Sequence, residues 1–214
     1  MELRGKLIVL DGADGAGKST QITRAASFLS DRGYSVLVTK EPGSSHIPVC
    51  TEFRKLALHT EGLTSYEREL IFMADAAVHA RHLSQWLQSY DYVICDRGWW
   101  SHVVYQTATH KIGKMTKSEY ETVSKLVPTF VVSPDYSIIF DVNFEVATKR
   151  MVNRGGQDLI EKLGPEFLKT VNIEYKAIKP GHRVLFINAN QTPDEVTNDL
   201  KKVLNKIVRR KKRS

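Results

Sequence analysis

The chain has 214 residues, of which 42% are hydrophobic, so we expect one well-buried core and a single domain over residues 1–214. No apolar run approaches the ~20 residues that cross a bilayer, and the N-terminus does not resemble a signal peptide, which argues against a membrane protein. The formal net charge is +7, but five positive charges lie within 209–213, so the rest of the chain carries only +2.

This charge distribution predicts little affinity for nucleic acid, apart from weak contacts through the basic tail 209–214. The two cysteines, Cys50 and Cys95, are too few for a disulfide framework. Cys95 lies inside an apolar run and is interpreted as a small core residue. A reduced, cytoplasmic location therefore fits the cysteine content best.

Short apolar runs alternate with longer segments of helical pattern. The runs are continuous, as strands buried on both faces require, and they cover 6–11, 35–39, 91–96, 136–141 and 183–187. Helices are predicted over 18–32, 49–59, 64–89, 117–127, 143–154, 159–178 and 193–209, with Thr64 and Glu67 as a capping box. This alternation predicts an α/β fold of three layers, in which helices flank a five-stranded parallel sheet.

A phosphate-binding loop follows the first predicted strand. Its residues fit G-x-x-x-x-G-K-[ST] and continue to a threonine: Gly12, Ala13, Asp14, Gly15, Ala16, Gly17, Lys18, Ser19 and Thr20. Glycines let backbone N–H groups approach phosphate oxygens, and the next helix adds its positive N-terminal end. Lys18 is expected to reach the β- and γ-phosphates of ATP, and the Ser19 hydroxyl to bind Mg²⁺. The motif predicts nucleoside triphosphate binding without identifying the reaction.

A second charged pair follows the third predicted strand. Asp96 is expected to hold the metal ion and its waters, because the carboxyl end of a parallel strand faces the loops. Arg97 strengthens this interpretation, because a guanidinium binds phosphate in a bidentate manner.

Six motifs occur in order over nearly the whole chain. They are the glycine-rich loop with Asp14, then Glu41-Pro42-Gly43, Arg54, Phe72-Met73-Ala74-Asp75 with His79, Asp96-Arg97 with Ser101, Tyr105 and Gln106, and a segment with Arg150, Arg154, Asp158 and Glu161. Together they resemble the thymidylate kinase family. The resemblance implies a P-loop kinase fold with a helical lid at about 150–162, and the use of ATP with Mg²⁺ to phosphorylate a deoxynucleoside monophosphate. The expected reaction is dTMP to dTDP in dNTP biosynthesis, catalysed by a homodimer.

The resemblance also implies the site residues. Those expected to bind the acceptor nucleotide are Asp14, Glu41, Pro42, Arg54, Phe72, Ala76, Arg97, Ser101, His102, Tyr105 and Gln106. Those expected to act in catalysis are Lys18, Asp96, Arg97 and the lid residue Arg154, with Arg150 on ATP and with Ser19 and Asp96 on the metal. In this scheme Arg54 and Arg97 hold the acceptor phosphate, Phe72 stacks on the base, and Tyr105 favours a deoxyribose.

Three positions depart from the family pattern. Gly98 replaces an aromatic residue or histidine, Ala76 replaces an arginine that reaches thymine, and Leu159 replaces a lid arginine. These changes raise the hypothesis that His102 or a neighbouring tryptophan recognises the base, with an altered or broader range of deoxynucleotides.

Other classes of P-loop protein remain as alternatives. A deoxynucleoside kinase needs a carboxylate base, for which Glu41 is a candidate, but its signature has Glu-Arg-Ser where this chain has Asp96-Arg97-Gly98. A regulatory GTPase needs Asn-Lys-x-Asp, whereas Asn205-Lys206 is followed by Val208 at the aspartate position. A nucleic-acid-dependent ATPase normally carries additional domains for which this chain has no room.

Overall fold

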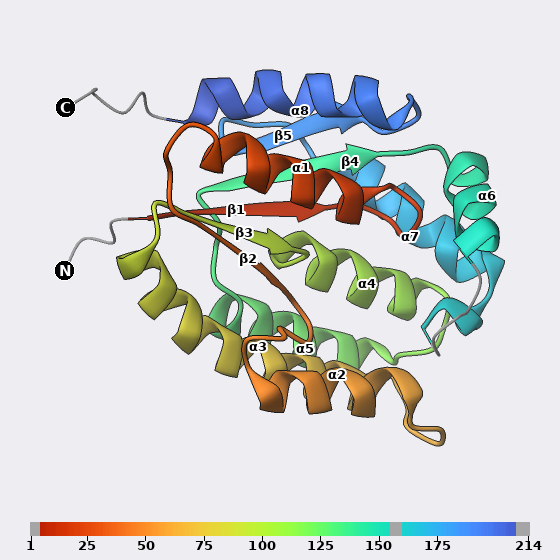
Figure 1. Cartoon of the computed structure of the whole chain (residues 1–214). Coiled ribbons are helices and arrows are strands. Elements are labelled where there is room, and N and C mark those ends of the chain that lie inside the picture. The colour runs from red at the N-terminus through yellow and green to blue at the C-terminus, as the bar shows by residue number, and fades with distance from the viewer. Residues whose placement is uncertain (1–4, 155–159, 209–214) are drawn as a thin grey trace.

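The structure, a computed structural model, describes residues 5–154 and 160–208, apart from the side chains of Arg154 and Glu161. Within these residues five parallel strands form one sheet in the order β2-β3-β1-β4-β5 (Figure 1). The strands are β1 (Lys6–Asp11), β2 (Val36–Lys40), β3 (Tyr92–Asp96), β4 (Tyr136–Asp141) and β5 (Val184–Asn188). All five expected strands are confirmed to within one residue at each end.

Helices cover both faces of the sheet. They are α1 (Lys18–Ser30), α2 (Pro48–His59), α3 (Ser65–Ser89), α4 (Trp99–Lys111), α5 (Lys117–Phe130), α6 (Phe144–Arg154), α7 (Pro165–Ala177) and α8 (Pro193–Ile207). Ile8 and Leu10 of β1 belong to the core shared with α1 and α8, whereas Leu7 and Val9 pack in a second core with Leu83 of α3. This alternation explains why the strand is apolar throughout, because each of its faces is buried.

Three helices begin with a capping box. Thr64, Thr116 and Thr192 each accept a hydrogen bond from a backbone N–H of the first helical turn, and a glutamate three residues later bonds back. The capping box predicted at Thr64 and Glu67 is therefore confirmed.

Two helical segments differ from the sequence-based expectation. Helix α4 was not predicted, because several of its buried residues are polar, including Ser101 and Gln106, and they obscure the apolar periodicity of a helix. The helix predicted over 159–178 is a 3₁₀ turn, Glu161–Leu163, followed by α7. Gly164 has a φ of 98° and Pro165 lacks an N–H donor, so this pair ends the turn and restarts the helix.

The parallel strands end at a common edge, where Asp11 of β1 and Asp96 of β3 precede the glycine-rich loop and α4. Helix α6 closes over this edge, since a Cβ at Gly15 would lie 2.3 Å from the carbonyl oxygen of Ala147. No helix within 5–154 or 160–208 combines the length and apolarity that crossing a bilayer would require.

The packing of α6 on the glycine-rich loop can be tested with Gly15→Ala and Gly33→Ala. Both glycines have positive φ, 79° and 78°, but a Cβ at Gly33 meets no atom within 4 Å. We expect Gly33→Ala to cost roughly 1 kcal/mol of unfolding free energy and Gly15→Ala at least about twice as much, because only Gly15 meets a neighbouring backbone. Equal costs in urea denaturation would contradict this packing.

Candidate functional site

The glycine-rich loop joins β1 to α1 and leaves the first turn of α1 open. Gly17 is the N-cap residue with a φ of 84°, and no side chain caps this helix. Lys18 is buried, and its Nζ donates hydrogen bonds to the carbonyl oxygens of Gly12 (2.8 Å) and Ala13 (3.0 Å). Burial, followed by the positive field of Arg97, lowers the pKa of Lys18 to about 8. Exposed N–H groups and a largely protonated amine make this loop suited to a polyphosphate.

Arg97 joins the third strand to the glycine-rich loop. It has a φ of 70°, unusual for a residue with a Cβ, and its backbone N–H donates to the carbonyl of Leu10 at 3.0 Å. Its guanidinium donates to Gly12 O (3.3 Å) and Ser101 Oγ (3.2 Å) and forms an ion pair with Asp14. Burial acts to lower the pKa of Arg97, but Asp14 outweighs it and the guanidinium stays charged.

Asp14 also binds a tyrosine from α4. The Tyr105 hydroxyl donates to Asp14 Oδ2 at 2.6 Å, and the Arg97 guanidinium lies 5.2 Å above the centre of the Tyr105 ring. These contacts fix Tyr105 beside the loop, so one end of the site is a rigid cluster of an arginine, a carboxylate and a phenol.

Buried carboxylates surround the two cations. Asp11 accepts a hydrogen bond from Ser101, whose hydroxyl also lies 2.8 Å from that of Tyr175. Burial raises the pKa of Asp11, against the opposing effects of Ser101 and Arg97. Asp11 Oδ2 and Asp96 Oδ1 are buried, and neither has a hydrogen bond within the described chain. Oxygens of this kind fit a hard cation such as Mg²⁺.

No group of three or more His, Cys, Asp or Glu side chains placed to hold a metal ion occurs in residues 5–154 and 160–208. Mg²⁺ commonly takes most of its ligands from water and phosphate and needs only one or two carboxylates from the protein.

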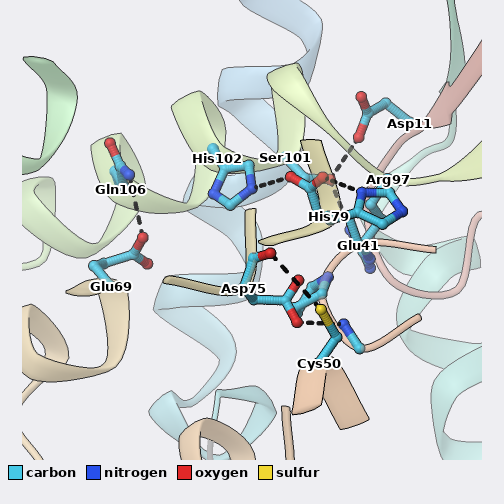
Figure 2. Close-up of polar contacts among 12 residues, drawn as sticks. Asp11, Glu41, Cys50, Glu69, Asp75, His79, Arg97, Ser101, His102 and Gln106 are labelled. Atoms are coloured by element: carbon cyan, nitrogen blue, oxygen red, sulfur yellow. Dashed lines mark hydrogen bonds and ion pairs between the residues drawn. The ribbon is translucent and has the colours of Figure 1, made fainter. Parts of the chain in front are cut away.

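A buried carboxylate within the site bridges two histidines (Figure 2). Glu41 follows β2, and its two oxygens lie 2.7 Å from His102 Nε2 and 2.7 Å from His79 Nδ1. His79 Nε2 continues the chain to Thr39 Oγ1 at 2.9 Å. Burial would raise the pKa of Glu41, but the hydrogen bonds from His102 and His79 outweigh it and lower that pKa to about 2.

The pKa of His102, the partner of Glu41 on α4, shifts in the opposite direction. Burial opposes the charged form of His102, but the hydrogen bond and the negative charge of Glu41 raise its pKa above 6.5. Glu41 therefore favours the imidazolium form of His102, and because this carboxylate holds Nε2, Nδ1 is the ring nitrogen left for other contacts.

Gly43, in the turn after β2, allows Arg54 of α2 to pack closely against this turn. A Cβ at Gly43 would lie 2.4 Å from Cδ of Arg54, and Arg54 donates to the carbonyl of Pro42 at 3.2 Å. The N–H of Gly43 donates to Asp75 of α3 at 3.1 Å. Arg54 therefore passes over the turn, where only a glycine leaves room for it.

These groups enclose a cavity of about 280 Å³. It is lined by Asp14, Glu41, Pro42, Arg54, Leu58, Glu69, Phe72, Arg97, Ser101, His102, Tyr105, Thr109, Ile160 and Phe167. The structure thus brings together nine of the eleven residues expected to bind the acceptor. The cavity combines a cationic end, a phenylalanine wall and buried polar groups, as nucleotide pockets commonly do.

The other two expected residues lie outside the cavity lining. Ala76 is fully buried in a hydrophobic cluster with Met73 and Val127, and Gln106 donates to Glu69 at 3.2 Å. The tryptophans after Gly98 do not line it either, because Trp99 and Trp100 pack against hydrophobic clusters. Of the two candidates for base recognition, only His102 reaches the cavity.

Three residues expected to contact ATP lie outside the cavity lining, namely Ser19, Thr20 and Arg150. Ser19 and Thr20 are exposed in the first turn of α1. Arg150 donates to Ala189 O (2.8 Å) and Gln191 O (3.2 Å) and reaches Gly15 O at 3.4 Å, so it links α6 to the β5–α8 loop. Arg154 ends α6, but its side chain lies outside the described residues, as do Asp158 and the side chain of Glu161.

Sequence reasoning missed Tyr175 and five residues of the cavity lining: Leu58, Glu69, Thr109, Ile160 and Phe167. Glu69 lines the cavity from α3, and Tyr175 of α7 reaches the Ser101 hydroxyl. Glu69 stands one turn before Phe72 in the predicted helix 64–89, and this position was a usable signal. For Tyr175, nothing local in the sequence marks the contact.

Comparison with known proteins supplies a family. A family model described as thymidylate kinase matches residues 10–200. A thymidylate kinase of Caldicellulosiruptor saccharolyticus is 30% identical over 98% of this chain and 100% of its own. A probable thymidylate kinase of Archaeoglobus fulgidus is 32% identical over 97% and 99%, and a thymidylate kinase of Mesoplasma florum is 30% identical over 92% and 93%.

The bridge between Glu41 and His102 predicts a pH-dependent contribution to stability. A raised pKa means that charged His102 stabilises the fold below its unfolded value of 6.5 and that this contribution is lost as pH rises. In Glu41→Gln the negative charge is gone and burial favours the neutral imidazole. The cost of Glu41→Gln in unfolding free energy should therefore shrink between about pH 6 and about pH 9.

Chemical denaturation at both pH values measures this cost. His102 is faced by Glu41, Glu69 and Asp11, so a matched control is Glu174→Gln, a carboxylate that pairs with Lys111 at 2.6 Å instead. A Glu41→Gln cost that stays constant or grows with pH would refute the charged pair.

Proposed function

The chain belongs to the thymidylate kinase family, and on that premise we propose that it transfers the γ-phosphoryl group of ATP to dTMP, giving dTDP and ADP. One observation carries the proposal. Lys18 of the glycine-rich loop and Arg97 at the edge of the cavity both donate to the carbonyl oxygen of Gly12. Lys18, which is suited to the phosphates of ATP, and Arg97, which is suited to the acceptor phosphate, therefore lie side by side at the Gly12 carbonyl oxygen.

The residues present can position both reactants. The N–H groups of the loop and Lys18 would neutralise the β- and γ-phosphates, while Arg97 and Arg54 would hold the acceptor phosphate at the cationic end of the cavity. An acceptor phosphate oxygen then forms a bond to the γ-phosphorus, and the bond from that phosphorus to the bridging oxygen of ADP breaks. A nucleotide phosphate is already ionised near neutral pH, so no side chain has to remove a proton.

We propose Mg²⁺ as the metal ion, with Ser19 and Asp96 as the residues that would hold it directly or through water. The free buried oxygen Asp96 Oδ1 and the polyphosphate site beside it are consistent with this donor set. When bound, Mg²⁺ supplies charge neutralisation on the phosphates.

The remaining contacts are assigned along the cavity. Tyr105, held by Asp14, would crowd the 2′ position of the sugar, and Phe72 would stack on the base. His102 would face the base edge through Nδ1, since Glu41 occupies Nε2. Arg150 would contact ATP, and Arg154 would serve as the lid arginine.

The chain's wider setting is also proposed. We assign it to the cytoplasm as a homodimer formed through α3, whose Leu70 is among the large apolar side chains left exposed. An altered range of deoxynucleotides is the second candidate, because Ala76 is buried away from the cavity. A deoxynucleoside kinase has less support, because both oxygens of Glu41 already accept hydrogen bonds.

A coupled assay of ADP release tests the function. The panel contains dTMP, dUMP, dGMP, dAMP, dCMP, the free nucleosides and single-stranded DNA. We expect dTMP to give the highest kcat/KM and EDTA to abolish turnover until Mg²⁺ is restored. Purified protein that binds ATP but phosphorylates no deoxynucleotide would contradict the proposal.

Arg97→Lys tests the junction at Gly12. A lysine keeps one positive charge but cannot reach Gly12, Ser101 and Asp14 together, so kcat should fall by about 10²- to 10³-fold. The matched control is Arg32→Lys, whose guanidinium lies 3.4 Å above the Phe28 ring outside the site. Steady-state kinetics in which both variants retain wild-type kcat would show that Arg97 plays no part in the reaction.

A further inference from the structure

One carboxylate of the cavity has no counterpart in the expected site. Glu69 lies on α3, one helical turn before Phe72, and is only 5% exposed although it lines the cavity. Burial, against the opposing charge of His102, raises its pKa to about 7. A buried carboxylate of this kind is costly unless hydrogen-bond donors reach it.

The other carboxylates that line the cavity are already engaged. Asp14 accepts from Arg97 and Tyr105, and the two oxygens of Glu41 accept from His79 and His102. Glu69 accepts one hydrogen bond among the described residues, from Gln106 Nε2 to Oε2 at 3.2 Å. An ionised carboxylate can accept about four, so Glu69 has acceptor capacity left for a molecule in the cavity.

The position of Glu69 decides which part of a nucleotide would use that capacity. Figure 2 shows Glu69 and Gln106 on the side of His102 away from Arg97. If the acceptor phosphate lies at Arg97, the base lies toward Glu69. Phe72, one turn along α3 and also in the cavity lining, shares a face of the helix with Glu69, so a base stacked on Phe72 presents its edge to this carboxylate.

We propose that Glu69 is a specificity-determining residue that accepts a hydrogen bond from the ring N–H of the acceptor base, which in dTMP is N3–H. His102 completes the contact by donating from Nδ1 to the neighbouring carbonyl oxygen. The pair therefore selects a base edge on which a ring N–H adjoins a carbonyl group. This assignment rests on the proposed function, because it takes dTMP as the acceptor.

The test removes the donor and the acceptor separately. The donor is removed by replacing dTMP with its N3-methyl analogue, and the acceptor by Glu69→Ala. Wild-type protein should prefer dTMP over the analogue by on the order of 100-fold in kcat/KM, and Glu69→Ala should reduce that preference to below about 10-fold. Glu69→Gln keeps an acceptor oxygen and should retain a preference above about 10-fold.

Glu174→Gln provides the matched control. Glu174 is a partly buried carboxylate of α7 that pairs with Lys111 at 2.6 Å and is not part of the cavity lining. This variant should keep the wild-type preference, and unchanged ATP binding would show that each variant is folded. Active wild-type protein with an undiminished preference in Glu69→Ala would overturn the role of Glu69, whereas wild-type protein inactive on dTMP would contradict the proposed function itself.

Discussion

The carbonyl oxygen of Gly12 is the point on which the site depends. It accepts hydrogen bonds from Lys18 and from Arg97, and two cations so close together repel unless negative charge surrounds them. Asp14 and Asp96 supply that charge: they favour the charged form of both cations, although burial and Arg97 still lower the pKa of Lys18 overall. A Cβ at Gly12 would lie 2.9 Å from the carbonyl of Phe140, so the junction is also held against β4. The position of the Gly12 carbonyl oxygen is therefore set both by the charges around it and by the close packing of Gly12 on β4.

Much of the fold followed from local patterns. Strands buried on both faces are continuous apolar runs, and the threonine caps and the glycine-rich loop are short motifs with their own geometry. These features needed no knowledge of distant residues. Arg97 lines the cavity because a residue directly after a parallel strand lies at the edge where the loops gather. By contrast, α4 was missed because its buried face is polar, and that polarity has meaning only in the assembled site.

The remaining parts of the site come from contacts between distant segments. Glu69 and Gln106 are separated by 37 positions, and Ser101 and Tyr175 by 74. No periodicity within one helix marks such pairs. Ala76 is a residue that was expected in the cavity but does not line it. It lies one turn from Phe72 on the same helix, yet it belongs to a hydrophobic cluster. Family resemblance supplied positions, while tertiary packing decided which of these residues line the cavity.

The turn at Gly43 has a mechanical consequence. Arg54 lies across that turn and bonds the carbonyl of Pro42, while the preceding residue, Glu41, holds the imidazole of His102. A displacement of α2 would therefore be transmitted through this turn to Glu41, and from Glu41 to the imidazole of His102. If Arg54 holds the acceptor phosphate and His102 faces the base, as proposed above, this turn links the groups at the two ends of the bound nucleotide.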